Sequence, residues 1–315
     1  MEIPDNLKNS MKKISRRIAV KTLTATAITI FAGCTRSETG KGKKLPVALN
    51  CGTLNGYKLP LEKQVKLVSQ AGYDGIEPWT RDMEEYFSRG KKLSDAKKLF
   101  EDANLKVCNL IGFAKCMSDD ATERAKGLEQ MKREIEWAAG IGSKNIACTM
   151  LGVERLDPQK FDEYAARYRA VIEIATPCGV KPLLELWGHR ALHRLGDALD
   201  IAARTGSGRA GLLLDFYHLY RGGNSFDSLA LLNLADMDVF HINDYPANPP
   251  REKLTDADRI FPTEGICPFG EILPKMKKQG FKGCLSLEIF NKKYWATYQP
   301  EELLKIGLQK IKAIA

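Results

Sequence analysis

The stretch GLLLDFYHLYRGG, residues 211–223, contains the sequence pattern that predicts the fold of the whole chain. Three leucines lead directly into Asp215, and His218 follows three residues later. A short apolar run bounded by turn residues is typical of a fully buried strand. Neither a core nor an ordinary surface turn needs a carboxylate and an imidazole at the end of such a strand. The stretch therefore predicts a buried strand that delivers Asp215 to a functional edge.

The same unit recurs along the chain from Leu45 onward. Eight strand-like runs are LPVALNC (45–51), YDGIEPW (73–79), LKVCNLIGF (105–113), SKNIACTM (143–150), VKPLLELW (180–187), AGLLLDF (210–216), MDVFHIND (237–244) and KGCLSLEIF (282–290). Amphipathic segments typical of helices separate or follow them, at 59–72, 93–104, 121–142, 161–179, 190–206, 269–280 and 300–315. Several of these segments end in Gly or Asn, the usual helix stop.

Eight strands alternating with helices over about 270 residues predict an α/β fold, a single (β/α)8 barrel spanning residues 45–315. No linker divides this range. The alternative is an open doubly wound sheet, which wants a glycine-rich phosphate loop after its first strand. The sequence LNCGTLNG at 49–56 does not fit that fingerprint.

The basic character of the chain is concentrated in its first 44 residues. Ten Lys/Arg and three Asp/Glu give this segment a net charge of +7, which leaves +2 of the total +9 for the barrel. A basic surface for nucleic acid is therefore not expected. Seven cysteines follow residue 44 without a C-x-x-C pair, so we expect no zinc ribbon and no complete disulfide framework.

The leader KKISRRIAVKTLTATAITIFAGC has the layout of an export signal. Arg16-Arg17 precede a mildly apolar stretch that ends at Cys34. This pattern predicts a twin-arginine signal with a lipoprotein cleavage box over 1–34, then a polar tether over 35–44. We expect an exported, periplasmic or cell-envelope protein anchored to the membrane only by a lipid on Cys34. A soluble chain with a basic tail is the alternative, and Met11 is an alternative start to Met1.

Polar residues stand at the carboxyl ends of several predicted strands. Because active sites of (β/α)8 barrels are assembled at these ends, we expect a site there from Glu77, Glu185, Asp215, His241, Asp244 and Glu288. Each alone is more often a solvated turn carboxylate or a core histidine. Their recurrence on four consecutive strands favours a metal site with ligands Glu185, Asp215, His241 and Glu288. This oxygen-rich set suits Mn²⁺ or Mg²⁺, and leaves Co²⁺ or Zn²⁺ open.

The stretches YDGIEPW, LLELWGH, LLLDFYH, FHINDYP and LSLEIF resemble the xylose isomerase-like barrels, a superfamily of sugar isomerases and epimerases. The resemblance covers 45–315. It implies one divalent ion on the four ligands named above, with Glu185 and Glu288 also acting as the acid/base pair. It assigns substrate hydroxyls to His218 and to Arg259. The segment DADRIFPTEG departs from the family pattern D-R-x-x-P-G-x-G, because Thr263 and Glu264 follow Pro262.

Weaker signals surround this set. Trp79 and Trp187 follow strand-end positions, and each either stacks on a sugar or packs in the barrel. Glu77 is either a sugar-hydroxyl acceptor or a brace for a loop, and His189 either positions the site or caps the next helix. The long loop 245–265 is expected to cover the substrate, with a variable surface insertion as the alternative.

We expect from these residues a metal-dependent isomerase or epimerase that acts on an unphosphorylated sugar or sugar derivative through an enediolate. A lyase or hydratase acting on a keto-sugar or 3-keto-glycoside is the first alternative. A carbohydrate-binding lipoprotein without catalysis is the second. The partner is then a small sugar, and a homodimer remains open.

Overall fold

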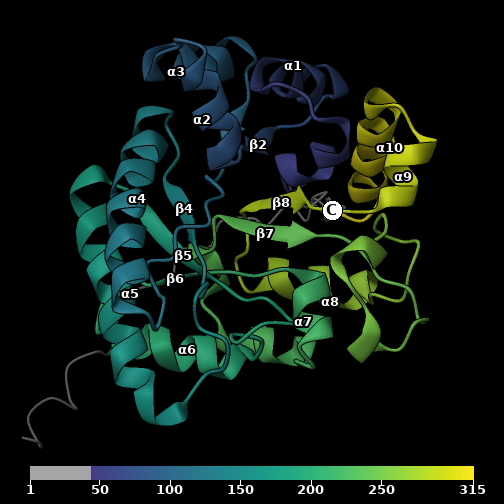
Figure 1. The fold of residues 1–315 in the computed structure, drawn as a ribbon. Helices are drawn as coiled ribbons and strands as arrows, with labels where there is room; N and C mark the ends of the chain where they lie inside the picture. Colours follow the sequence, from purple (N-terminus) through teal and green to yellow (C-terminus); the bar gives the residue numbers. More distant parts are fainter. Residues whose placement is uncertain (1–43) are drawn as a thin grey trace, which may run out of the picture. The chain divides into compact units, whose positions relative to one another are not determined.

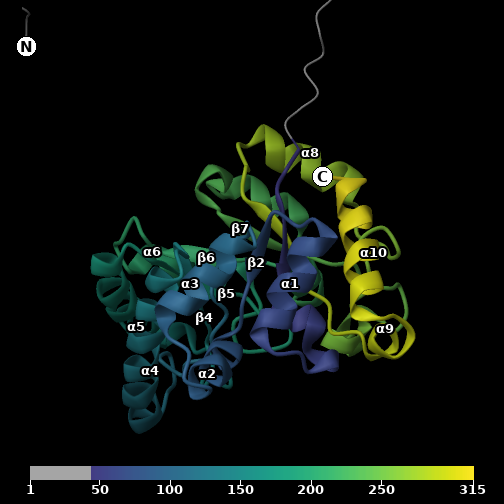
Figure 2. The ribbon, with the colours of Figure 1, turned by 90° about the horizontal axis from the view of Figure 1, so that it is seen from above.

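In the computed structural model, which describes residues 44–315, eight strands form a ring that helices surround (Figures 1 and 2). The strands are β1 (Val47–Asn50), β2 (Gly75–Glu77), β3 (Lys106–Val107), β4 (Asn145–Cys148), β5 (Lys181–Glu185), β6 (Gly211–Leu213), β7 (Val239–Ile242) and β8 (Cys284–Leu287). All strand pairs are parallel. The described residues belong to one compact unit, Lys43–Ala315.

Two short bridges close the ring. The strands pair as a five-stranded sheet in the order β3-β2-β1-β8-β7 and a three-stranded sheet in the order β4-β5-β6. The parallel bridge Leu110↔Ile146 joins β3 to β4, and the bridge Asp215↔His241 joins β6 to β7. A sheet closed in this way has no free edge, and the predicted (β/α)8 barrel is confirmed.

Ten α-helices lie in the described region: α1 (Leu61–Ala71), α2 (Thr80–Ser88), α3 (Leu93–Asp102), α4 (Ala121–Gly140), α5 (Phe161–Ala175), α6 (Leu195–Arg204), α7 (Phe216–Arg221), α8 (Phe269–Lys278), α9 (Lys292–Thr297) and α10 (Pro300–Lys312). Every predicted helical segment contains one of them. The sequence analysis missed α2, α7 and α9. The last two have six residues each, too few for an apolar periodicity to be recognised.

The strands are shorter than the predicted runs. Residues of the runs that follow the strands lie at the rim of the barrel and form the site. Only Lys106 and Val107 of the run 105–113 form β3. After the last paired residues the chain leaves the sheet and places polar side chains at the rim. Asp215, for example, caps helix α7, because its Oδ1 accepts a hydrogen bond of 2.8 Å from the backbone N–H of His218.

The strands and the cysteines of the described region are largely buried. Strands β1, β4, β7 and β8 are buried at every position. The seven cysteines of the described region are free thiols, and only Cys178 is exposed. In residues 44–315 we find no helix with the length and apolarity that crossing a membrane requires. The expected export signal, the lipidation residue Cys34 and the tether up to residue 43 lie outside the described residues.

Candidate active site

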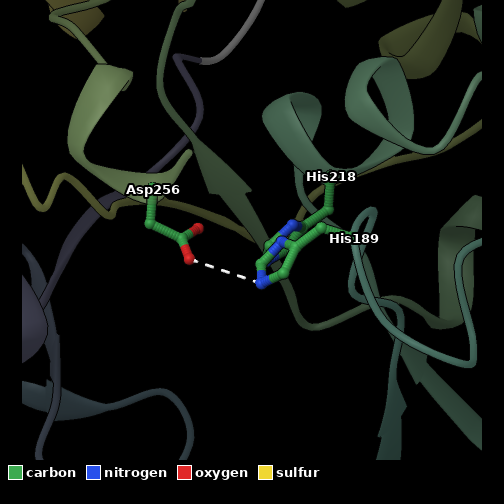
Figure 3. A group of neighbouring side chains, drawn as sticks. All are labelled: His189, His218 and Asp256. Atoms are coloured by element: carbon green, nitrogen blue, oxygen red, sulfur yellow. Dashed lines mark ion pairs between the residues drawn. The ribbon is translucent and has the colours of Figure 1, made fainter. Parts of the chain in front are cut away.

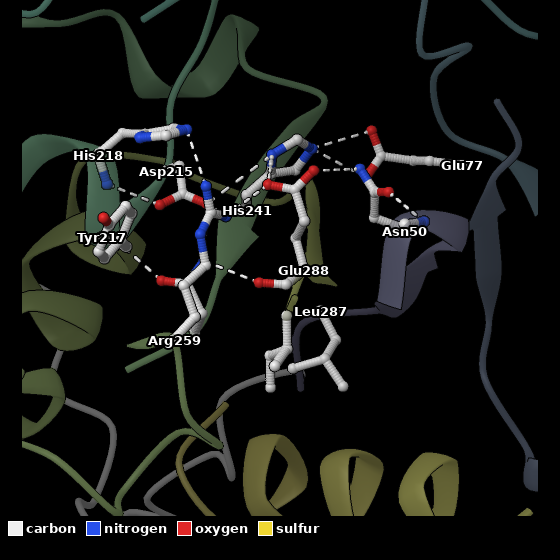
Figure 4. Close-up of polar contacts among 12 residues, drawn as sticks. Asn50, Glu77, Asp215, Tyr217, His218, His241, Arg259, Leu287 and Glu288 are labelled. Atoms are coloured by element: carbon white, nitrogen blue, oxygen red, sulfur yellow. Dashed lines mark hydrogen bonds and ion pairs between the residues drawn. The ribbon is translucent and has the colours of Figure 1, made fainter. Parts of the chain in front are cut away.

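Side chains from four neighbouring strands meet at the carboxyl-terminal rim. Glu185 ends β5, Asp215 follows β6, His241 lies in β7 and Glu288 follows β8, and all four are at most 6% exposed. Asp215, His241 and Glu288 each bring a ligand atom within 4.8 Å of the other two (Figure 4). Glu185 is outside this group of three but lines the pocket above it, together with Glu288.

The pocket has a volume of about 390 Å³ and opens at this rim. Its polar lining comes from Asn55, Glu185, His189, Arg190, His218, Asp256, Arg259 and Glu288, and its apolar lining from Trp79, Ile111, Phe113, Trp187 and Phe290. Asp215 and His241 are buried and do not line it, whereas Glu288 and Arg259, which contact them, do. A larger cavity of about 690 Å³ lies between the segment 225–230 and helix α8, and it contains none of the predicted site residues.

The two glutamates of the pocket have opposite tendencies to ionise. Burial, together with repulsion from Glu288, raises the pKa of Glu185 to about 8. Burial also disfavours the charge on Glu288, but His241 and Arg259 outweigh it and lower the pKa of Glu288 to about 2. Without a bound ion, one carboxyl is therefore protonated near neutral pH while the other is ionised. Such a pair is suited to give a proton on one side of a substrate and accept one on the other.

Glu77 braces His241 rather than lining the pocket. Its two carboxylate oxygens lie 3.1 and 3.2 Å from His241 Nε2, and its second partner is the side-chain amide of Asn109 at 2.9 Å. Glu77 is fully buried, so the expected role of sugar-hydroxyl acceptor does not agree with its place. A carboxylate on one imidazole nitrogen fixes the ring so that the other nitrogen faces inward, the usual support for a metal-bound histidine.

Two asparagines that the sequence analysis missed orient the carboxylates. Asn50 donates to Glu288 Oε1 at 2.8 Å, and its own oxygen accepts from the Trp79 indole at 2.7 Å. Asn243 donates to Asp215 Oδ2 at 2.7 Å. Both stand at strand ends, in the runs LPVALNC and FHIND, so the strand-end reasoning used for the acidic residues would have found them.

Arg259 lies on the carboxylates. Its side chain is 1% exposed, and its Nη1 donates to Glu288 Oε2 at 2.6 Å and to Asp215 Oδ2 at 3.1 Å (Figure 4). The guanidinium carbon lies 4.6 Å from the centre of the Tyr217 ring and 5.1 Å from that of Phe290. The sequence analysis expected Arg259 to hold a substrate hydroxyl. The structure places it at the pocket wall, but engaged with two predicted metal ligands.

His218, His189 and Asp256 form a second polar group at the pocket (Figure 3). His189 Nε2 lies 3.7 Å from Asp256 Oδ2, and the two imidazole rings are 5.6 Å apart. Burial and the nearby charge of Arg259 lower the pKa of His218, so this ring is neutral. The backbone N–H of Gly188 lies 3.2 Å from His218 Nδ1 and Arg259 Nη2 lies 2.9 Å from Nε2, so an N–H donor faces each ring nitrogen. When Arg259 does not hold Nε2, Nδ1 can accept from Gly188 and Nε2 can donate a hydrogen bond to an oxygen.

The residues that depart from the family pattern, Thr263 and Glu264 of the loop 245–265, do not line the pocket. Asp244 holds the loop by accepting backbone hydrogen bonds from Tyr245, Thr263, Gly265 and Cys267. Thr263 adopts a φ of 77°, a left-handed conformation in which glycine is the common residue. The added carboxylate of Glu264 contacts Tyr294 Oη at 2.7 Å and Lys310 Nζ at 3.1 Å. It ties the loop to α9 and α10 and does not line the pocket.

Aromatic rings form one wall of the pocket. The ring centre of Trp79 lies 4.9 Å from that of Phe113 and 6.1 Å from that of Phe290, and Phe113 is 6.2 Å from Trp187. Both tryptophans that the sequence singled out therefore line the pocket and also pack on neighbouring rings. Such a wall suits the apolar face of a sugar or another ring.

The buried polar atoms fit a divalent cation. Glu185 Oε2 and His241 Nδ1 have no hydrogen-bond partner although both are buried. His241 Nδ1 lies 3.2 Å from Glu288 Oε2, without the angle of a hydrogen bond. Buried polar atoms are normally paired. Three carboxylates and one imidazole converging there are a donor set that Mn²⁺, Mg²⁺ or Zn²⁺ accepts.

Comparison with known proteins identifies the family of the barrel. A family model described as "Xylose isomerase-like TIM barrel" matches residues 65–314. An inosose isomerase of Bacillus velezensis is 26% identical over 258 residues, 81% of this chain and 91% of that protein. A 3-dehydroshikimate dehydratase of Pseudomonas aeruginosa is 23% identical over 244 residues, 73% of this chain and 36% of that protein. A crystal structure of the IolI protein with a bound zinc atom superposes with a TM-score of 0.79 at 23% identity, covering 86% of this chain and 98% of that one.

Proposed function

The chain belongs to the xylose isomerase-like TIM barrel family, and on that basis we propose that it is a divalent-metal-dependent isomerase or epimerase of an unphosphorylated sugar or sugar derivative. One observation carries the proposal. Glu185 and Glu288 line a single pocket, and Glu288 also lies within one group of potential metal ligands with Asp215 and His241. Strands β5 and β8 are three positions apart in the ring of eight, so the two carboxyls approach the pocket from different sides.

The ion would be held by Glu185, Asp215, His241 and Glu288. When bound, it supplies positive charge that polarises a carbonyl and stabilises the negative charge left when a neighbouring C–H proton departs. Mn²⁺ suits the three carboxylates, and Zn²⁺, present in the structural relative, suits the imidazole as well.

The residues of the chain divide the remaining work. One glutamate removes a proton from a carbon next to the carbonyl, which produces an enediolate, and the other returns a proton to the opposite face or to the adjacent carbon. His218 donates a hydrogen bond to a substrate oxygen from Nε2. Trp79 and Trp187 cover the apolar face of the substrate and exclude water from it.

A lyase or dehydratase is the second candidate. The similarity to a 3-dehydroshikimate dehydratase favours it. The same proton removal leads to elimination when the substrate carries a leaving group on the carbon next to the carbanion. The mass of the product distinguishes the two reactions. Elimination lowers the mass by that of one water molecule, whereas isomerisation leaves the molecular formula unchanged.

The experiment that tests the proposal measures deuterium uptake. Purified protein loaded with Mn²⁺ is incubated in D₂O with a panel of free ketoses, inososes and 3-keto-glycosides. We expect metal-dependent incorporation of deuterium into one class of substrate. Glu185→Gln and Glu288→Gln are each expected to lower turnover at least ~100-fold, the usual weight of an acid or base. Full activity in both variants would rule out the acid/base pair.

We also propose that the protein is exported and anchored by a lipid on Cys34. The support is the twin-arginine pair and the apolar stretch that ends at Cys34. Outside the cytoplasm sugar phosphates are scarce, which favours an unphosphorylated substrate.

A further inference from the structure

We propose that Arg259 is an internal counter-ion that occupies part of the metal position in the metal-free protein, and that the ion must displace it before the substrate site is complete. The inference rests on the proposed metal site. It concerns what this chain's own residues do while no ion is bound. Arg259 would then couple two events, metal binding and the assembly of the substrate pocket.

The position of the guanidinium carries the first step. Arg259 Nη1 lies 2.6 Å from Glu288 Oε2 and 3.1 Å from Asp215 Oδ2. These two carboxylates belong to the group whose ligand atoms lie within 4.8 Å of one another. A divalent ion binds carboxylate oxygens at about 2.0–2.6 Å. The ion and Nη1 would share the same oxygens, and the repulsion between two cations at this distance favours movement of the guanidinium away from the ion.

The guanidinium replaces the ion only in part. It satisfies Asp215 and Glu288 but does not reach Glu185 Oε2 or His241 Nδ1, which stay buried without a partner. A guanidinium presents its N–H donors in one plane, which matches carboxylate groups. It cannot coordinate the lone pair of an imidazole nitrogen as a metal ion does. The set of four therefore remains incomplete with Arg259 and would be complete with an ion.

Nη2 of Arg259 has an unfavourable hydrogen-bonding contact with His218. Arg259 Nη2 lies 2.9 Å from His218 Nε2, while the N–H of Gly188 points at His218 Nδ1 from 3.2 Å. A neutral imidazole has one donor and one acceptor nitrogen. With either tautomer, one N–H of His218 faces another N–H. This contact is relieved when the guanidinium shifts away from Nε2.

A resting place for the displaced side chain is already present. Asp256 Oδ1 accepts from Arg259 Nη2 at 2.6 Å and from Nε at 3.1 Å. Asp256 lines the pocket and its side chain is 38% exposed, unlike the buried carboxylates below. The rings of Tyr217 and Phe290 flank the path. We infer that the guanidinium moves between the rings of Tyr217 and Phe290 toward Asp256, where its released N–H groups can donate to a substrate oxygen.

Metal affinity tests the displacement. The dissociation constant of Mn²⁺ is measured by titration calorimetry on the full chain for the wild type, Arg259→Met and Arg259→Lys. Because displacement reduces the apparent affinity, we expect both variants to bind Mn²⁺ at least ~10-fold more tightly than the wild type. Without metal, Arg259→Met should unfold at a lower temperature than the wild type, since the buried carboxylates lose their counter-ion. Added Mn²⁺ should then raise its unfolding temperature by more than that of the wild type.

Arg259→Lys and Arg190→Met are the controls. Lysine keeps the charge but lacks the fork, so tighter binding in Arg259→Met alone would reflect the lost charge and would overturn the displacement. If the methionine variant does not fold, the lysine variant decides alone. Arg190 lines the same pocket, and Arg190→Met should leave the Mn²⁺ affinity within about twofold of the wild type. Unchanged affinity in both Arg259 variants would refute the inference and leave the proposed function intact. If neither the wild type nor any variant binds Mn²⁺ or Zn²⁺, the proposed function fails with it.

Discussion

At the scale of single residues, the site separates two chemically identical side chains by their surroundings. Glu185 has one buried oxygen without a partner, whereas Glu288 is bonded by Asn50 and Arg259 and lies beside His241. Burial alone raises the pKa of both carboxyls. The neighbouring positive charges reverse this effect only for Glu288.

This difference predicts opposite effects of two matched substitutions on the metal-free protein. The pKa of Glu185 is about 8 in the folded state, above its ordinary value, so its carboxyl stabilises the fold most at acidic pH and loses this contribution as the pH rises through 8. Glu185→Gln should therefore gain stability relative to the wild type between about pH 5 and pH 8, by up to roughly 1.4 kcal/mol per pH unit. Urea unfolding of chelator-treated protein measures the free energy at each pH.

Glu288→Gln serves as the counterpart. The folded-state pKa of Glu288, about 2, lies below its ordinary value, so its stabilising contribution is fully present above that ordinary value and is lost as the pH falls toward 2. In the same range from about pH 5 to pH 8, Glu288→Gln should be less stable than the wild type, and this deficit should shrink toward pH 8 because loss of the Glu288 charge also lowers the pKa of Glu185. A Glu288→Gln variant that is more stable than the wild type throughout this range would contradict the assignment.

At the scale of elements, the loop after β7 brings Arg259 and Asp256 to the pocket. Asp244 organises this loop by accepting four backbone N–H groups. Gly265 lies so close to it that a Cβ there would stand 2.4 Å from Asp244 Oδ1 and 2.2 Å from the carbonyl oxygen of Tyr245. The loop therefore depends on the missing side chain at Gly265, while the changed residues Thr263 and Glu264 are accommodated on its outer side.

Gly265→Ala should consequently displace the loop. We expect a loss of about 1–3 kcal/mol of stability from overpacking and weaker binding of substrate, since Arg259 and Asp256 shift with the loop. Gly270→Ala is the matched control, because nothing lies within 4 Å of its Cβ position in helix α8. That substitution should leave substrate binding unchanged and stabilise the helix by about 0.5–1 kcal/mol. Thermal unfolding and the KM measure the two effects, and equal behaviour of both variants would contradict the argument.

At the scale of the whole molecule, the barrel assembles the site, whereas the leader bears on where the protein is located. The barrel from Lys44 to Ala315 brings together residues from every part of its sequence. Glu77 and His241, for example, are 164 positions apart. The leader carries +7 of the net charge of +9, and under the proposed export it would determine where the protein meets its substrate.

The full chain should therefore be found with membranes after expression in a bacterium that has the twin-arginine and lipoprotein pathways. We expect labelled fatty acid to be incorporated into the wild type and not into Cys34→Ser, because the proposed lipid is attached to this thiol. Replacement of Arg16 and Arg17 by lysine should leave the protein in the cytoplasm. Cys178→Ser, at an exposed cysteine of the barrel, should retain the label. Equal labelling of Cys34→Ser would refute the anchor.

The sequence by itself determined the barrel and the acidic residues and histidine at its rim. Strand-end positions follow from local patterns: an apolar run ends, and the first polar residues after it face the rim. Asp215, His241, Glu185 and Glu288 could be named for this reason. Asn50 and Asn243 occupy equivalent positions at the ends of β1 and β7, so the same local pattern predicts them as rim residues.

Only the tertiary structure decided how these residues pair. Three sets of contacts join segments whose register is set by closure of the ring. Glu77 contacts His241, Arg259 contacts Asp215 and Glu288, and Glu264 contacts Tyr294. No local pattern encodes such pairings, because each joins residues that lie between 29 and 164 positions apart in the sequence. Burial then assigned different pKa values to Glu185 and Glu288. Desolvation depends on the whole fold rather than on the residues beside each carboxyl.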